Sequence, residues 1–153
     1  MNYLEKVSEF HKTFNAPILE SPKIPSDDRC NLRVNLLQEE LDELKEAINN
    51  KDLVEVLDAL CDLQYVLSGA ILEFGLKDIF NESFDEVQRS NMSKACSSIQ
   101  EAIETLSFYK QKDGTEGHYK EINGKFICYR NNDNKVLKSI NYSPVKLEFE
   151  NVK

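Results

Sequence analysis

The chain has 153 residues, of which 41% are hydrophobic and 30% are charged, a composition typical of one globular domain with its own hydrophobic core. The net charge of −8 argues against a general nucleic-acid binder, because phosphate backbones are bound by clusters of Lys and Arg. No apolar run approaches roughly 18 residues, and the N-terminus carries Glu and Lys among its apolar residues, so we expect neither a membrane span nor a signal peptide.

The first half of the sequence predicts three helices. Apolar residues recur at helical spacing in residues 1–14, and a proline-rich stretch that we expect to be an extended loop follows them. A second helix is predicted from about residue 30 to residue 49, with Asp27 or Asp28 as its N-cap. The third predicted helix starts after the N-cap residue Asp52 and reaches Phe74.

The second half predicts more helix and then a change to β-structure. Gly75 ends the third helix, residues 77–94 predict a short helix and turn, and a long helix is expected over 93–112. The sequence HYKEINGKFICYRNNDNKVLKSI predicts a hairpin about its Asn-Gly and a possible third strand after NNDN. We therefore expect a mainly α protein, with a helical domain over 1–112 and a β-hairpin appendage and tail of the same domain over 113–153.

The spacing of the cysteines bears on zinc binding and cellular location, and the distribution of charge bears on the kind of ligand. The four cysteines include no Cys-x-x-Cys pair, which argues against zinc, and Cys61 and Cys128 lie in apolar runs that predict buried free thiols in a cytoplasmic protein. Between Lys110 and Lys146, eight basic residues stand against four acidic ones. An acidic body with a basic appendage suits a small anionic ligand, provided that a metal ion mediates on the acidic side.

The third predicted helix carries acids on an otherwise apolar side. Glu55, Asp58 and Asp62 are three and four residues apart, so their side chains cover a narrow wedge of the helix. The helix is apolar nearly all round, which predicts a position inside a bundle and carboxylates withdrawn from water. Because no Lys or Arg lies in this helix, a divalent cation is the simplest compensation for their charge.

The second predicted helix supplies matching acids in LLQEELDELKEA. Glu40 and Glu43 are three residues apart, and antiparallel packing of the two helices would turn them toward Asp58 and Asp62. Hard oxygen ligands of this kind suit Mg²⁺ or Mn²⁺. A Glu-x-x-Glu pair alone is more often a solvated face, and the acids of the apolar helix are what favour a site here.

The sequence LLQEELDELKEAI followed by EVLDALCDLQYVLSGAILEFGL resembles the all-α nucleoside triphosphate pyrophosphohydrolases, which include MazG proteins, dimeric dUTPases and phosphoribosyl-ATP pyrophosphohydrolases. The signature of that superfamily is Glu-x-x-Glu on one helix and Glu-x-x-Asp on the next, and Glu40, Glu43 and Asp62 match three of its positions. Alanine occupies the remaining position, so either Asp58 takes that role, or Glu55 and Asp58 form the second pair and Asp62 is additional. The segments FDEVQRSNMSK and NKVLKSINYSP resemble a phage and bacterial MazG-like subgroup.

The resemblance implies an all-α NTP pyrophosphohydrolase-like helical bundle that binds Mg²⁺ and cleaves a nucleoside triphosphate between its α- and β-phosphates. Glu40 or Glu39 would accept the proton of the attacking water. The expected metal ligands are Glu40, Glu43, Glu55, Asp58 and Asp62. The expected substrate-binding residues are Arg89, Asn91, Lys94, Tyr65, Lys135 and Lys138. The basic residues can equally be solvated cations at a helix end, and Tyr65 can be a core aromatic residue.

Two other functions stay open at this point. The substrate can be phosphoribosyl-ATP, or the chain can be a catalytically silent helical module that binds only metal or partner helices, as the missing Glu would allow. The third helix is apolar on too many sides for one small bundle, so we expect a homodimer or a higher homo-oligomer, which the resemblance also implies.

Overall fold

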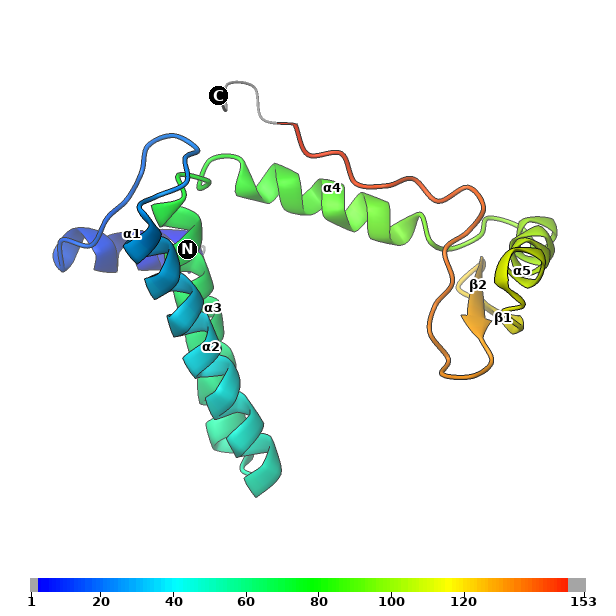
Figure 1. Ribbon diagram of the computed structural model, residues 1–153, viewed down its shortest axis with the longest axis horizontal. Coiled ribbons are helices and arrows are strands. Elements are labelled where there is room, and N and C mark those ends of the chain that lie inside the picture. Colours follow the sequence, from blue (N-terminus) through cyan, green and yellow to red (C-terminus); the bar gives the residue numbers. More distant parts are fainter. Residues whose placement is uncertain (1–2, 149–153) are drawn as a thin grey trace. The chain divides into compact units, whose positions relative to one another are not determined.

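In the computed structural model, residues 3–148 are described and form five helices and one antiparallel β-hairpin (Figure 1). The prediction of a mainly α protein with a small β-hairpin toward its C-terminus is confirmed. Among the predicted ranges, residues 1–2 and 149–153 lie outside the described residues. The described chain divides into two units, residues 3–81 and residues 82–148.

The first unit is an antiparallel helical hairpin with a shorter helix packed on its second arm. Its helices are α1 (Tyr3–Thr13), α2 (Asp27–Asn50) and α3 (Leu53–Glu73). Lys51 adopts a left-handed conformation, which turns the chain tightly between α2 and α3. Asp52 caps α3 as predicted, because its side chain accepts hydrogen bonds from the N–H groups of Val54 and Glu55.

The ends of these helices correct one prediction and explain another. α2 begins at Asp27, and Ser26 takes the N-cap position, so the prediction that Asp27 or Asp28 is the cap is wrong. Both acids lie in the first turn, where negative charge is favourable beside the helix dipole. Gly75 follows α3 with a φ of 67°, and a Cβ atom there would collide with the carbonyl oxygen of Ser21, so glycine is required where the loop returns to the helix end.

A buried network of charged side chains joins the three helices of this unit. Glu73 at the end of α3 is 1% exposed and accepts hydrogen bonds from Arg29 and Arg33 of α2. Nη2 of Arg33 also lies 3.4 Å from Nε2 of His11 on α1. The charge of Glu73 is thereby compensated within the chain, and this end of the hairpin is closed.

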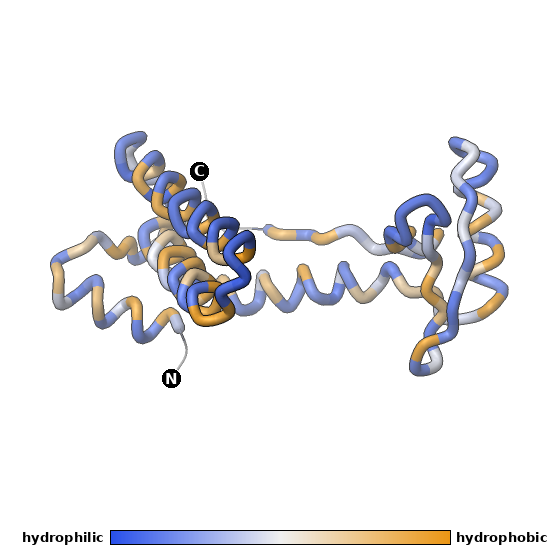
Figure 2. Tube along the Cα trace, turned by 90° about the horizontal axis from the view of Figure 1, so that it is seen from below, coloured by the Kyte–Doolittle hydropathy of each residue, from blue (hydrophilic) through white to orange (hydrophobic). Residues whose placement is uncertain are grey.

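The opposite end of the hairpin, beside the α2–α3 turn, is open. Leu53, Val54 and Leu57 are 79%, 75% and 62% exposed, and the tube in Figure 2 shows apolar residues recurring along both arms. Within residues 3–81, α2 packs on one side of this part of α3, whereas Leu53, Val54 and Leu57 on its other side stay exposed. The predicted burial of Cys61 is wrong, since its side chain is exposed, whereas Cys128 is buried as predicted.

The second unit combines one helix with the hairpin. Its elements are most of α4 (Phe80–Met92), then α5 (Ile99–Asp113), β1 (Gly117–Ile122) and β2 (Lys125–Arg130). The strands pair about Asn123 and Gly124, whose φ angles of 50° and 72° fit the tight Asn-Gly turn that the sequence predicts. The third predicted strand does not form in the described residues, where Val136 makes only an isolated bridge to Tyr129.

α5 begins six residues later than predicted because the preceding segment belongs to the hairpin. Cys96 forms an isolated bridge with Phe126, and the Ser98 side chain then caps α5 by accepting a hydrogen bond from the N–H of Glu101. The core of this unit lies between α5 and the strands and consists of Cys96, Ala102, Cys128 and Leu137. The two units divide between residues 81 and 82.

None of the helices in residues 3–148 combines the length and the apolarity that crossing a bilayer requires.

Candidate functional site

The acids predicted to form the site come from both arms of the hairpin in the first unit. Glu40 of α2 is half-buried, and its pKa is raised by burial first and then by the negative charges of Asp62, Glu43, Glu39 and Asp58. Because Asp58 and Asp62 belong to α3, the two helices present their carboxylates to a shared surface.

One oxygen of Glu40 has no partner. Within residues 3–148, Oε2 of Glu40 and Nε of Arg33 are the buried side-chain polar atoms that make no hydrogen bond. A buried carboxylate oxygen without a donor is costly, and neighbouring carboxylates increase the cost. The surface thus has an excess of acceptors and lacks a positive partner. A donor set made only of carboxylate oxygens fits a hard divalent cation such as Mg²⁺ or Mn²⁺.

The acids do not form a closed metal centre in this structure. In the part of the chain that is described, no group of three or more His, Cys, Asp or Glu side chains converges closely enough to hold an ion. Asp62 is half-buried like Glu40, whereas the acids open to solvent are Glu39, Glu43, Glu55 and Asp58. The expectation that the α3 carboxylates are withdrawn from water is wrong for Glu55 and Asp58, which are exposed, whereas Asp62 is half-buried.

A polar cavity of about 410 Å³ lies beside these acids, toward the α2–α3 turn. It is lined by Glu43, Glu46, Ala47, Asn50, Asp52, Glu55, Asp58 and Ala59. Glu55 and Asp58 both line the cavity, so the geometry keeps both as alternatives for the ligand position that Ala59 vacates in the sequence signature. Asp58 has the additional property that its charge acts on Glu40.

Tyr65 lies on α3 one turn beyond Asp62 and is 40% exposed, so it is not a core residue. Its ring packs edge to face against Phe10 of α1, with 5.6 Å between ring centroids. It borders a mostly apolar cavity of about 530 Å³ that is lined by Tyr3, Lys6, Val7, Leu60, Cys61, Gln64 and Tyr65. The predicted role in stacking on a base is compatible with this open position.

The basic candidates of the RSNMSK motif lie in the second unit and are engaged by nearby groups. The guanidinium of Arg89 donates to both carboxylate oxygens of Glu86, at 2.6 and 2.8 Å, and to the carbonyl oxygen of Pro144 at 3.0 Å. The ammonium of Lys94 donates to the side-chain oxygen of Asn91 at 2.7 Å. These contacts hold the motif together and attach the C-terminal segment to it.

The two lysines predicted from the tail differ in their surroundings. Lys135 is exposed, and its backbone N–H donates to Asp133 in a tight turn. Lys138 lies over the ring of Tyr142, with its Nζ atom 4.4 Å from the ring centroid. Sequence reasoning missed Tyr142, although it stands in the segment NKVLKSINYSP that carries part of the family resemblance.

Comparison with known proteins finds a family match over the part of the chain that contains these acids. The family model described as phosphoribosyl-ATP pyrophosphohydrolase matches residues 7–91, more than half of the chain, and this stretch includes all of α2 and α3. An uncharacterized protein of Acanthamoeba polyphaga mimivirus is 26% identical, over an alignment that covers 90% of each of the two chains.

Proposed function

Because this chain belongs to the phosphoribosyl-ATP pyrophosphohydrolase family, within the all-α nucleoside triphosphate pyrophosphohydrolase superfamily, we propose that it is a Mg²⁺-dependent nucleoside triphosphate pyrophosphohydrolase. The family supports the coarser statement of pyrophosphohydrolase activity. The finer proposal is that a nucleoside triphosphate is converted into a nucleoside monophosphate and pyrophosphate, as part of removing unwanted nucleotides.

The observation that carries this proposal is the buried, unpartnered oxygen of Glu40 among the carboxylates of two helices. We propose that Glu40, Glu43, Asp58 and Asp62 hold the metal ion, with Glu55 as the alternative to Asp58. A bound Mg²⁺ would neutralise phosphate oxygens and make a nearby water more acidic.

The chain itself supplies the remaining chemistry. Glu40, whose Oε2 atom is buried without a hydrogen-bond partner, is proposed to accept the proton of the attacking water. Glu39, its exposed neighbour, is the alternative base. Arg89, Asn91 and Lys94 are proposed to face the phosphates and Tyr65 the base, with Lys135 and Lys138 as further cations.

Incubation of the protein with a panel of nucleoside triphosphates and Mg²⁺ tests this proposal. Pyrophosphate is the expected product rather than orthophosphate, and EDTA is expected to stop the reaction. Asp62→Asn should lower kcat at least about tenfold, since even groups that only support a metal ligand have effects of that size. Asp42→Asn is the control, because Asp42 lies exposed on α2 and pairs with Lys45. An Asp62→Asn variant as active as the wild type would disprove the proposed site.

A second candidate substrate is phosphoribosyl-ATP, which the description of the matching family favours. Measuring kcat/KM for phosphoribosyl-ATP beside the triphosphate panel separates the two substrates. A larger value for phosphoribosyl-ATP than for every triphosphate would replace the nucleoside triphosphate proposal.

A silent metal-binding module is a third candidate, favoured by Ala59 at a position where the family signature has Glu. Thermal melts with and without Mg²⁺, run beside the pyrophosphate assay, distinguish this case. Stabilisation by Mg²⁺ without turnover would favour the silent module over the hydrolase.

We also propose that the protein is at least a homodimer. The exposed side chains of Leu53, Val54 and Leu57 form an apolar face on α3 that a second copy can cover. Sedimentation at micromolar concentration should show a dimer or a larger assembly, and a monomer would contradict the proposal. All four cysteines are free, which supports a location in the reducing cytoplasm.

A further inference from the structure

The end of the second unit runs in an extended conformation along α4, as the ribbon in Figure 1 shows. We call residues 139–146 the C-terminal strap. Its backbone is attached by hydrogen bonds from Ser139 N–H to Lys94 O (3.1 Å), Ser143 N–H to Ser93 Oγ (2.9 Å) and Lys146 N–H to Glu86 Oε1 (2.9 Å). The strap is therefore fixed to α4, and to the turn after it, along most of its length.

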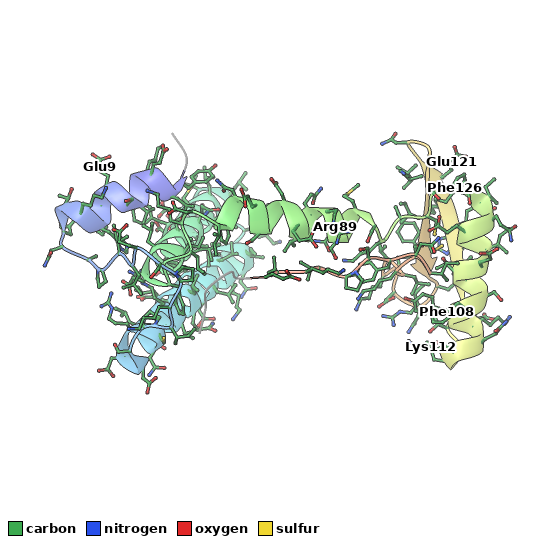
Figure 3. All side chains as sticks on the ribbon, turned by 90° about the horizontal axis from the view of Figure 1, so that it is seen from above. Glu9, Arg89, Phe108, Lys112, Glu121 and Phe126 are labelled. Atoms are coloured by element: carbon green, nitrogen blue, oxygen red, sulfur yellow. The ribbon has the colours of Figure 1, made fainter. Side chains whose placement is uncertain are left out.

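Arg89 is one of the residues that fasten the strap. Figure 3 labels it on α4, where its guanidinium contacts Glu86 and the carbonyl oxygen of Pro144 in the strap. Arg89 thus holds the strap through its Nε and Nη2 atoms.

The strap brings Tyr142 to the RSNMSK motif, and Lys138 directly precedes the strap. The hydroxyl of Tyr142 lies 3.1 Å from Oγ of Ser90, a buried residue on α4. Lys138 covers the ring of Tyr142 and, within residues 3–148, makes no hydrogen bond or ion pair. The pKa of Tyr142 is lowered by the hydrogen bond to Ser90 and then by the positive charges of Lys138, Lys94 and Arg89. The charges of three cations thus act on one phenol hydroxyl.

Positive charge is in excess around Tyr142, although basic and acidic residues are equal in number over the whole second unit. Residues 82–148 contain ten basic and ten acidic residues. Around Tyr142, however, Arg89, Lys94 and Lys138 are offset only by Glu86, which is already bound to Arg89 and to the strap backbone. Docking of the strap adds Lys138, the residue before the strap, to the two cations Arg89 and Lys94.

We propose that the docked strap completes a polyphosphate-binding site, in which Lys94, Lys138 and the hydroxyl of Tyr142 bind the oxygens of a triphosphate or of pyrophosphate. Lys94 keeps further N–H groups beyond the one given to Asn91, and a tyrosine hydroxyl can donate one hydrogen bond. Ammonium and hydroxyl donors bind phosphate oxygens, and a multiply charged chain of phosphates matches the excess of cations better than a single carboxylate does. The inference rests on the proposed function for the source of the anion.

Calorimetric titration of the full chain with tripolyphosphate in the presence of EDTA tests this site apart from any metal. Parallel titrations with pyrophosphate and orthophosphate identify the length of anion that the site prefers, and we expect orthophosphate to bind weakest. Tyr142→Phe keeps the ring under Lys138 and removes only the hydroxyl, and Lys138→Gln removes only the charge. Each variant should weaken tripolyphosphate binding about tenfold, the effect of losing one hydrogen bond to a charged group. Lys125→Gln, an exposed lysine on β2, is the control and should change the affinity less than twofold.

A spectroscopic measurement follows the same hydroxyl directly. Tripolyphosphate should raise the pKa of Tyr142, taken as the difference in phenol absorbance between wild type and Tyr142→Phe, because a nearby anion disfavours the phenolate. Equal tripolyphosphate affinity in wild type and both variants, or no binding by the wild type, would overturn the inference. If the triphosphate assay then still shows turnover with an unchanged KM, the proposed function stands without this site. Binding that depends on Tyr142 without any turnover would keep the site and reject the hydrolase.

Discussion

Replacing Glu40 with glutamine removes one charge from the acids shared by α2 and α3 and should stabilise the metal-free protein. Oε2 of Glu40 is buried without a hydrogen-bond donor, and burial followed by the charge of Asp62 raises the pKa of this carboxyl. A buried polar group without a partner costs about 1–3 kcal/mol. Glutamine recovers only part of that cost, because its amide can donate to a neighbouring carboxylate while its oxygen stays buried. We therefore expect the free energy of unfolding to rise by about 1 kcal/mol.

The sign of the pH dependence follows from the direction of the pKa shift. The pKa of Glu40 is higher in the folded protein than its ordinary value of 4.5, so the ionised group destabilises the fold at neutral pH. As the pH falls through the folded pKa, the folded wild type takes up a proton and the cost disappears. The advantage of Glu40→Gln should consequently be largest near neutral pH and vanish below the ordinary pKa.

Thermal denaturation in EDTA, at pH 7.5 and at acidic pH, measures this effect. A change of about 1 kcal/mol corresponds to about 4–8 °C in Tm for a cooperative unit of this size. Glu9→Gln is the matched control, because Glu9 is an exposed carboxylate on α1 of the same unit (Figure 3). Mg²⁺ should stabilise the wild type more than Glu40→Gln. A glutamine variant that melts below the wild type in EDTA at pH 7.5 would refute the reasoning from repulsion between like charges.

Three further predictions concern buried contacts within each of the two units. Glu73→Gln leaves Arg33, which is 8% exposed, without its charged partner, and urea denaturation should show a loss of about 3 kcal/mol; a loss below about 1 kcal/mol would contradict a buried ion pair. Gly69→Ala would place a Cβ atom 2.7 Å from the guanidinium of Arg33. The urea midpoint of this variant should therefore fall, although alanine favours helix over glycine by about 1 kcal/mol. A midpoint higher than that of the wild type would disprove this close contact. Burial alone would raise the pKa of Glu101, but hydrogen bonds from Ser139 and other groups lower it to about 2. Glu101 therefore stabilises the fold above its ordinary pKa of 4.5, and acid titration should show this stability being lost between about pH 4.5 and about pH 2 in the wild type but not in Glu101→Gln.

The features of the fold that were predictable from sequence have local causes. The side chain of Asp52 caps α3 by accepting hydrogen bonds from the N–H groups two and three residues ahead. An aspartate directly before a helix can always reach these groups. The Asn123-Gly124 turn is likewise determined by two residues that tolerate positive φ angles. In both cases the residues that stabilise the element are adjacent in the chain.

The features that were not predictable depend on partners far apart in the chain. Arg33 and Glu73 are 40 residues apart, and no periodic pattern links them. Residues 93–98 were predicted to be helical, but Cys96 pairs with Phe126 of β2, and this pairing delays the start of α5. Tertiary contacts override local helix propensity at such positions.

The candidate site divides in the same way. Helical spacing together with antiparallel packing of α2 and α3 predicts that Glu40 and Glu43 face Asp58 and Asp62, and the negative charge of Asp62 acts on the pKa of Glu40. Spacing does not reveal which acids are open to solvent, because exposure depends on what covers α3 from outside. Nor does it reveal Tyr142, whose proximity to α4 depends on the path of the strap.

The exposed thiol of Cys61 is a site for chemical labelling on the surface of α3. Cys96 and Cys128 are buried, and burial followed by the neighbouring Cys96 raises the pKa of Cys128 to about 12, so Cys128 forms little reactive thiolate at neutral pH. A maleimide reagent should accordingly label Cys61 well before the buried pair. Because Cys61 adjoins the apolar face of α3, its labelling rate would slow as the protein is concentrated whenever self-association shields that face.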